Sequence, residues 1–297
     1  MNETPMPNKG LDEFVNSLLP ETNLSPTAIA DKFSLYHQLS SPPSYQSIIT
    51  ACLAFVNEIE QKSNLPNAIR GFHCTYNNHT QLILRDHEQT GAIAHTLLHE
   101  IFEIIIERLN EKIKPTYKLT PYKANLFAAS VLMPEEVFFE QALKSDLDFL
   151  AIHRDHERYI HYSYLSLLLR LQYLFGLNKI CYLAIIAENK KAHYQHKDIN
   201  NLSNFKIIKV IHSRKNSITF DYNTLLEYLS RCYSGIIAQK DEKGRYTKSV
   251  TLEEGDFLIK ASPVPFRYYN SHIINRIVMQ IIPKEDYEAI LRKVVKP

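Results

Sequence analysis

The feature that most constrains the fold is an apolar stretch at residues 91–109 that contains imidazoles and carboxylates. A fold must bury this stretch and still provide partners for its polar side chains. Aliphatic side chains recur through the stretch at helical spacing, which predicts a mostly buried helix with Thr90 as its N-cap. Residues four apart on a helix are offset by only about 40°, so side chains at this spacing form one stripe. Burying imidazoles and carboxylates costs several kcal/mol unless they are paired or bound to a metal ion. The stripe consists of His95, His99 and Glu103, with Glu100 beside it.

The segments around this helix have patterns of their own. Apolar residues three and four apart predict a helix over residues 45–61. Alternation on both sides of an Asn-Asn pair predicts a β-hairpin at residues 72–84. A further helix is expected at residues 121–132, because Thr120 is a suitable N-cap and Pro134 follows the last turn.

The chain changes character after a helical zone at residues 135–173, which has a predicted break near residues 161–163. Alternating segments then predict strands, and amphipathic segments predict two helices. We therefore expect a separate α+β domain with its boundary near residues 176–180. The strands are expected at residues 181–187, 205–211, 217–220, 248–252 and 257–260, and the helices at residues 222–233 and 284–294.

Composition limits the class of protein. A chain of 297 residues is long enough for about two domains. Its 34 basic and 32 acidic side chains leave a net charge of +2, too small to indicate a nucleic-acid or membrane-surface protein by itself. The apolar stretch at residues 48–56 is under half of the roughly 20 residues that span a bilayer, and residues 1–19 lack the features of a signal peptide. We expect a cytoplasmic protein with no membrane partner.

The tetrad His99-Glu100-x-x-Glu103 differs by one residue from a zinc-peptidase motif. In HExxH, two imidazoles one turn apart bind the metal, and the intervening glutamate activates the metal-bound water. The form here is HExxE. Taken alone, such a tetrad also fits an internal His–Glu pair on a partly exposed helix face, so the tetrad by itself leaves both interpretations open.

The segment at residues 123–134 provides a second and more specific signature. Its sequence, Lys-Ala-Asn-Leu-Phe-Ala-Ala-Ser-Val-Leu-Met-Pro, closely resembles the Glu-Ala-Asn-x-Phe-Ala-x-x-Leu-Leu-Met-Pro of the ImmA/IrrE family of metallopeptidases. The family's Thr-Leu-x-His-Glu lead-in is matched at residues 96–100, and the resemblance covers residues 45–140. The matching positions of the second helix include Asn125, Phe127, Met133 and Pro134.

The chain departs from the family at two of three metal-ligand positions. The resemblance implies that His99 is the first ligand and Glu100 the general base. Glu103 stands where the family has its second histidine, and Lys123 stands where it has a ligating glutamate. A protonated lysine cannot bind zinc.

Two hypotheses follow for this site. In the metal-free hypothesis, Lys123 approaches Glu103, and this ion pair takes the place of the ion. In the metal hypothesis, zinc or manganese is held by His99, Glu103 and either His95 or Glu107, because carboxylates are legitimate ligands. The sequence does not choose between them.

The resemblance implies an α+β protein with a zincin-like helical metallopeptidase domain that includes a small β-hairpin or sheet. It also implies action on, or binding to, a partner helix-turn-helix transcriptional repressor in stress response or mobile-element control. If the protein is an enzyme, zinc is its cofactor and Glu100 takes a proton from the metal-bound water. The alternative is a catalytically inactive pseudopeptidase without metal that regulates by binding the partner. Direct DNA binding is the least favoured function, since no recognition helix is evident.

The dense charge around His153, His156 and His161 indicates a solvated helical face in preference to a second metal site.

The expected domain organisation follows from the resemblance and from the composition. The expected parts are an N-terminal extension at residues 1–44, a metallopeptidase-like domain at 45–140, a winged-helix-like helical region at 141–178 and a GAF-like sensory domain at 179–297.

Overall fold

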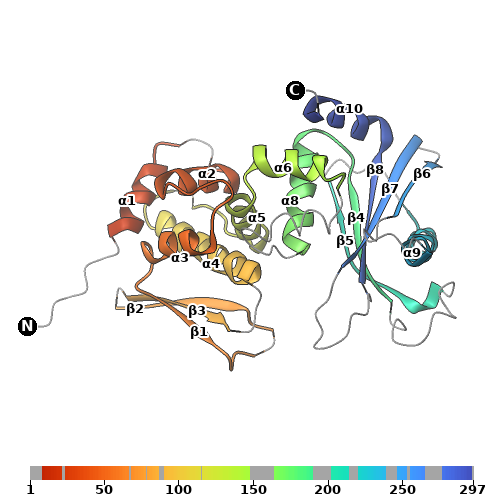
Figure 1. Cartoon of the computed structure of the whole chain (residues 1–297). Helices are drawn as coiled ribbons and strands as arrows, with labels where there is room; N and C mark the ends of the chain where they lie inside the picture. The colour runs from red at the N-terminus through yellow and green to blue at the C-terminus, as the bar shows by residue number, and fades with distance from the viewer. Residues whose placement is uncertain are drawn as a thin grey trace, which may run out of the picture. The chain divides into compact units, whose positions relative to one another are not determined.

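The computed structural model contains helices and two β-sheets (Figure 1). It describes residues 9–21, 24–66, 68–77, 79–86, 90–114, 116–147, 164–189, 202–213, 220–238, 246–252, 255–264 and 276–295. Contacts divide these residues into two compact units. The first unit contains the described residues up to Val137 and the beginning of helix α8 (Tyr164–Leu177) up to Arg170. The second contains residues 138–147 and the described residues from Leu171 onward.

Three helices begin the first unit: α1 (Lys9–Leu18), α2 (Pro26–Tyr36) and α3 (Tyr45–Leu53). The side chains of Ser25 and Ser44 cap α2 and α3, because each accepts a hydrogen bond from a backbone N–H of the first turn. These local signals explain where α2 and α3 begin.

A three-stranded sheet follows, with strands β1 (Glu58–Lys62), β2 (Gly71–Tyr76) and β3 (His79–Arg85). The strand order is β1-β3-β2, with β1 parallel and β2 antiparallel to β3. Asn77 has a φ of 49° between β2 and β3, a conformation that asparagine tolerates better than most residues. The predicted hairpin is confirmed.

The helix predicted over residues 45–61 is wrong in its second half. Helix α3 ends at Leu53, and residues 58–62 form strand β1. The backbone N–H of Asn57 donates to the carbonyl of Thr80 at 2.8 Å, and the Asn57 side-chain oxygen accepts from the Thr80 N–H at 2.8 Å. These bonds tie the chain to β3, so the helix does not continue.

Helix α4 (Thr90–Asn110) lies at the centre of the unit and packs against α3, α5 (Pro121–Leu132), β2 and β3 (Figure 1). Most of its residues are buried, as predicted. Helix α5 has the predicted limits, and the Thr120 side chain accepts from the Lys123 N–H at 3.3 Å as its N-cap. The pair α4–α5 is the frame on which the candidate site is built.

The first two helices are part of this same unit. The rings of Phe33 on α2 and Phe127 on α5 meet edge to face, with their centroids 5.6 Å apart. On α1, Asp12 accepts from the guanidinium of Arg108 on α4 at 2.8 Å. The segment expected as an N-terminal extension therefore packs directly on the helices that carry the site.

The second unit contains a five-stranded antiparallel sheet. After α6 (Glu135–Lys144) and α8, the elements are β4 (Leu183–Asn189), the 3-10 turn η3 (Leu202–Asn204), β5 (Phe205–His212), α9 (Tyr222–Ala238), β6 (Tyr246–Leu252), β7 (Gly255–Val264), β8 (Arg276–Pro283) and α10 (Lys284–Val295). The strand order is β5-β4-β8-β7-β6, and helix α9 covers one face of the sheet through a cluster of buried apolar side chains. The predicted α+β character of this region is confirmed, and its GAF-like character stays a prediction. The strand predicted at residues 217–220 falls almost entirely outside the described residues.

A buried polar network joins residues 138–147 to this sheet. Lys260 is almost fully buried and forms an ion pair with Asp146, which also accepts a 2.6 Å hydrogen bond from the Tyr287 hydroxyl. The side-chain amide of Gln280 donates to the Leu147 carbonyl at 2.9 Å. Because each buried polar group here has a partner, the network stabilises the second unit instead of leaving a desolvated charge.

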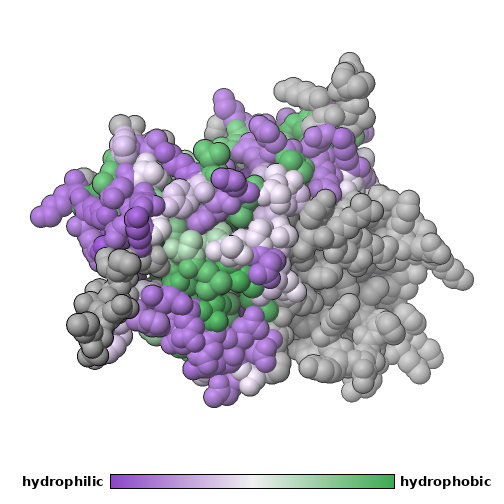
Figure 2. All heavy atoms as spheres, turned by 60° about the vertical axis from the view of Figure 1, so that its left-hand side comes forward, coloured by the Kyte–Doolittle hydropathy of each residue, from purple (hydrophilic) through white to green (hydrophobic). Residues whose placement is uncertain are grey.

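The described surface is mixed in character. Figure 2 shows hydrophilic side chains over much of the face in view, around a compact hydrophobic area. Among the helices in the described part of the chain, none combines the length and the apolar character needed to cross a bilayer.

Candidate functional site

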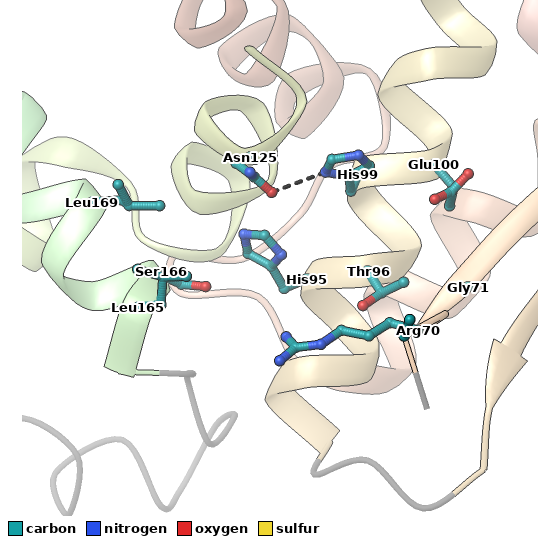
Figure 3. A pocket seen from close by; sticks show the side chains of 11 residues that line it. Arg70, Gly71, His95, Thr96, His99, Glu100, Asn125, Leu165, Ser166 and Leu169 are labelled. Carbon is teal, nitrogen blue, oxygen red and sulfur yellow. Dashed lines mark hydrogen bonds between the residues drawn. The ribbon is translucent and has the colours of Figure 1, made fainter. Parts of the chain in front are cut away.

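His99 points from α4 toward α5. Its Nδ1 donates to the Asn125 side-chain oxygen at 2.9 Å, and its Nε2 lies 3.3 Å from a carboxylate oxygen of Glu103, one turn further along α4 (Figure 3 shows the bond to Asn125). One ring nitrogen of His99 thus bonds to α5, and the other faces a carboxylate of its own helix.

Glu100 faces the sheet and is paired with a residue that the sequence analysis did not select. His73 on β2 places its Nδ1 2.9 Å from Glu100 and its Nε2 3.2 Å from Glu107. The hydrogen bond to Glu100 raises the pKa of His73, and the charge of Glu107 acts in the same direction, whereas burial opposes them. Two carboxylates on opposite ring nitrogens thus favour the imidazolium form.

Lys123 does not form the expected ion pair with Glu103, and that prediction is wrong. Its amine donates to the Lys118 carbonyl at 2.6 Å and lies 4.0 Å from the centre of the Tyr117 ring. The side chain therefore turns back over the segment before α5. Of the described residues, the ion-pair partner of Glu103 is His99.

The zinc site that the resemblance implies is incomplete. A catalytic zinc needs three protein ligands and one open position. His99 Nε2 and Glu103, 3.3 Å apart, suit two ligands of one tetrahedral ion. Helix α5 supplies no third ligand, because Lys123 stands at that position and points away. The residues at the family's positions therefore do not fit a catalytic zinc.

A different group, formed by residues of α4 and β2, could hold a metal ion. One ligand atom from each of His73, Glu100 and Glu103 lies within 4.8 Å of the others. Both ring nitrogens of His73 already face carboxylates, so an ion here must displace its hydrogen bond to Glu100 or Glu107. The group has suitable ligand types, but its histidine has another partner.

His95 and Glu107 lie outside this metal-capable group. Burial lowers the pKa of His95 to about 4, and the charges of His99 and Arg70 act in the same direction. Its Nε2 atom is buried and has no hydrogen-bond partner among the described residues. Glu107 is exposed and contacts His73 instead of the His99–Glu103 pair. Neither alternative third ligand is therefore brought together with both His99 and Glu103.

A pocket of about 360 Å³ opens beside α4 (Figure 3). Helix α4 contributes His95, Thr96 and His99 to its lining, and the beginning of α8 contributes apolar side chains. The guanidinium of Arg70, just before β2, extends below the His95 ring in this view. The full lining is Ala68, Arg70, Gly71, His95, Thr96, His99, Glu100, Asn125, Leu165, Ser166 and Leu169.

The signature residues of α5 have structural positions that explain their types. Asn125 orients His99, as a hydrogen-bond partner of a ligand-position histidine would. Phe127 is fully buried between Phe33 and Phe102, with the second ring centroid 4.9 Å away. Met133 ends the helix, and Pro134 follows it. The histidines His153, His156 and His161 lie outside the described residues.

Comparison with known proteins gives matches to solved structures and no sequence match. No protein-family model matches the chain, and no curated protein matches its sequence. The fold is similar to that of a solved Mycobacterium tuberculosis transcriptional regulator, with a TM-score of 0.59 and 11% identity over 94% of this chain and 82% of the other. At this identity the similarity concerns the fold alone.

Two residues of the site, His73 and Arg70, are not among those predicted from the sequence. The alternation of Phe72, Cys74 and Tyr76 predicts that these side chains face the core and that His73 faces solvent. The structure has the opposite arrangement, because all three are exposed and His73 faces α4. Nothing in the sequence around Arg70 indicates the direction of its side chain.

Proposed function

We propose that the protein is a transcriptional regulator of the metallopeptidase fold that binds a partner repressor without cleaving it. The position of Lys123 carries the proposal. Its amine is held by the Lys118 carbonyl and the Tyr117 ring, so the third zinc ligand is missing where the motif requires it.

The charges of the site support a metal-free state. The buried Glu100 carboxylate requires compensation, and His73 provides it, because its hydrogen bond to Glu100 raises the pKa of the imidazole. Glu103 is only partly buried and contacts His99. Neither carboxylate of the tetrad is left without a partner. Glu100, at the family's general-base position, is only 8% exposed and is hydrogen-bonded to His73. A general base must reach the water that it deprotonates, and this bond competes with that role.

The regulatory part of the proposal rests on two similarities. The signature from His99 to Pro134 resembles that of a family whose members act on repressors, and the whole chain resembles a protein described as a transcriptional regulator. Both favour a role in transcription.

The test is genetic complementation in the native host. Deletion of the gene should change the transcript levels of a limited set of genes, and Glu100→Gln should restore them, because glutamine still accepts from His73 while it cannot act as the base. Phe127→Asp should behave like the deletion, because it places a charge in the core. An unchanged transcriptome after deletion contradicts the regulatory role. A well-folded Glu100→Gln protein that behaves like the deletion contradicts the non-catalytic role.

A second candidate is a metal-dependent hydrolase, which the grouping of His73, Glu100 and Glu103 favours. In that case these residues would hold the ion, and the ion would supply an activated water. It predicts stoichiometric metal in the purified protein and loss of that metal in His73→Ala. The metal content therefore separates the two candidates.

A further inference from the structure

The pocket beside α4 is lined by a cation, Arg70, that has no carboxylate partner among the described residues. Arg70 is exposed, and no described residue forms an ion pair or hydrogen bond with its guanidinium. Glu100, the acidic residue in the lining, is bonded to His73. An arginine at a pocket wall presents several N–H donors in a planar fork, which matches a carboxylate in two parallel hydrogen bonds.

The beginning of α8 contributes a mainly apolar part of the lining. Leu165 and Leu169 lie there with Ser166, and Ala68 adds a further small apolar side chain. Leu165 is 40% exposed, so an apolar ligand group that covers it would be stabilised by removing this side chain from water. Figure 3 shows Leu165 and Ser166 on the side toward which the Arg70 guanidinium extends.

The size of the pocket limits the ligand. A volume of about 360 Å³ lies at the lower end of the range for ligand pockets, roughly 300–1,000 Å³. We infer that this pocket binds a carboxylate that carries an apolar group, either as a free small acid or as the C-terminal residue of a peptide. Arg70 binds the carboxylate, and Leu165 and Leu169 contact the apolar group.

This inference rests on the proposed function, since the pocket would receive either the chain end of the recognised partner or a small acid that regulates its binding. It is tested without that partner. We would titrate the full-length protein by calorimetry with N-acetyl-L-leucine and with N-acetyl-L-leucinamide, which has the same shape and no charge. The acid should bind at least about tenfold more tightly, as expected for a hydrogen bond to a charged group.

Two variants test the roles of Arg70 and Leu165 in binding. Arg70→Gln should weaken binding of the acid by about tenfold or more, and Leu165→Asp should weaken it through repulsion and loss of the apolar contact. Arg292→Gln is the matched control, because Arg292 is a highly exposed arginine on α10 of the second unit, and it should leave binding unchanged. Both test positions are exposed, so the variants should fold like the parent.

A second pair of probes distinguishes the two sources of the ligand. A hexapeptide ending in leucine is compared in its free-acid and amidated forms. Tighter binding of the peptide acid than of N-acetyl-L-leucine supports a protein chain end as the source, and the reverse supports a small acid. If neither acid binds better than its amide, or if Arg70→Gln has no effect, the inference is wrong. That result leaves the proposed function standing, because the transcript and metal measurements do not involve Arg70.

Discussion

The Nδ1 atom of His73 lies 2.9 Å from a carboxylate oxygen of Glu100, and this contact joins strand β2 to the central helix α4. Both side chains are close to 90% buried. A carboxylate at such depth is costly without a partner, and the imidazole provides one from a segment 27 residues away in the chain. Glu100, which the resemblance implies to be a general base, thus makes a structural contact with His73.

His73→Ala should lower the free energy of unfolding by about 1–3 kcal/mol, because it leaves the buried Glu100 carboxylate without its hydrogen-bond donor. Urea unfolding of the full-length protein measures this. In a Glu100→Gln background the same substitution should cost less, since a neutral amide needs no cation. Equal costs in the two backgrounds would show that the two residues do not interact.

Lys123→Ala should change the free energy of unfolding by less than about 1 kcal/mol. Its hydrogen bond to Lys118 is exposed to solvent, and a cation–π contact such as that with Tyr117 contributes about 0.5–1 kcal/mol at an exposed site. A buried pair with Glu103 would instead cost about 3–5 kcal/mol when broken. Denaturant unfolding separates the two values, and a loss in the larger range would restore the rejected ion pair.

Acid should destabilise the first unit through His37. Burial lowers the pKa of this residue from 6.5 to about 4, and its ring lies 4.5 Å from Phe33 and 4.9 Å from Phe55, centroid to centroid. The folded protein keeps His37 neutral while the unfolded chain takes up a proton below pH 6.5. The contribution of neutral His37 to the free energy of unfolding is therefore complete above pH 6.5 and decreases as the pH falls toward 4.

The expected loss from His37 is about 1–2 kcal/mol, after allowance for partial exposure to water. His37→Leu should remove this part of the acid dependence, because leucine does not titrate. Thermal unfolding between pH 7 and pH 4 gives the comparison. The same acid dependence in parent and variant would assign the effect to other groups.

The elements that could be predicted from the sequence are those with local signals. Helix α5 has both limits as predicted, because Thr120 caps it and Pro134 follows its end. Helix α4 was found from its apolar periodicity. Strand β1 was missed because its hydrogen bonds to β3 come from residues more than twenty positions away, and these override the helical pattern of residues 45–61.

Only part of the candidate site could be predicted from the sequence. The i, i+4 spacing of His99 and Glu103 places them together in any helix, and the structure confirms it. The direction of the Lys123 side chain depends on its hydrogen bond to the Lys118 carbonyl, and the periodicity of the sequence does not predict this bond. His73 reaches Glu100 only because the sheet packs on α4, so a tertiary contact decided which residue compensates the carboxylate.

The metal content of the purified full-length protein tests the metal-free site most directly. Protein prepared without chelators and supplied with zinc should contain well below one equivalent by elemental analysis. His99→Ala and His73→Ala should not lower that value, because both imidazoles pair with carboxylates instead of an ion. One zinc per chain that is lost in either variant would contradict the metal-free site and favour the hydrolase.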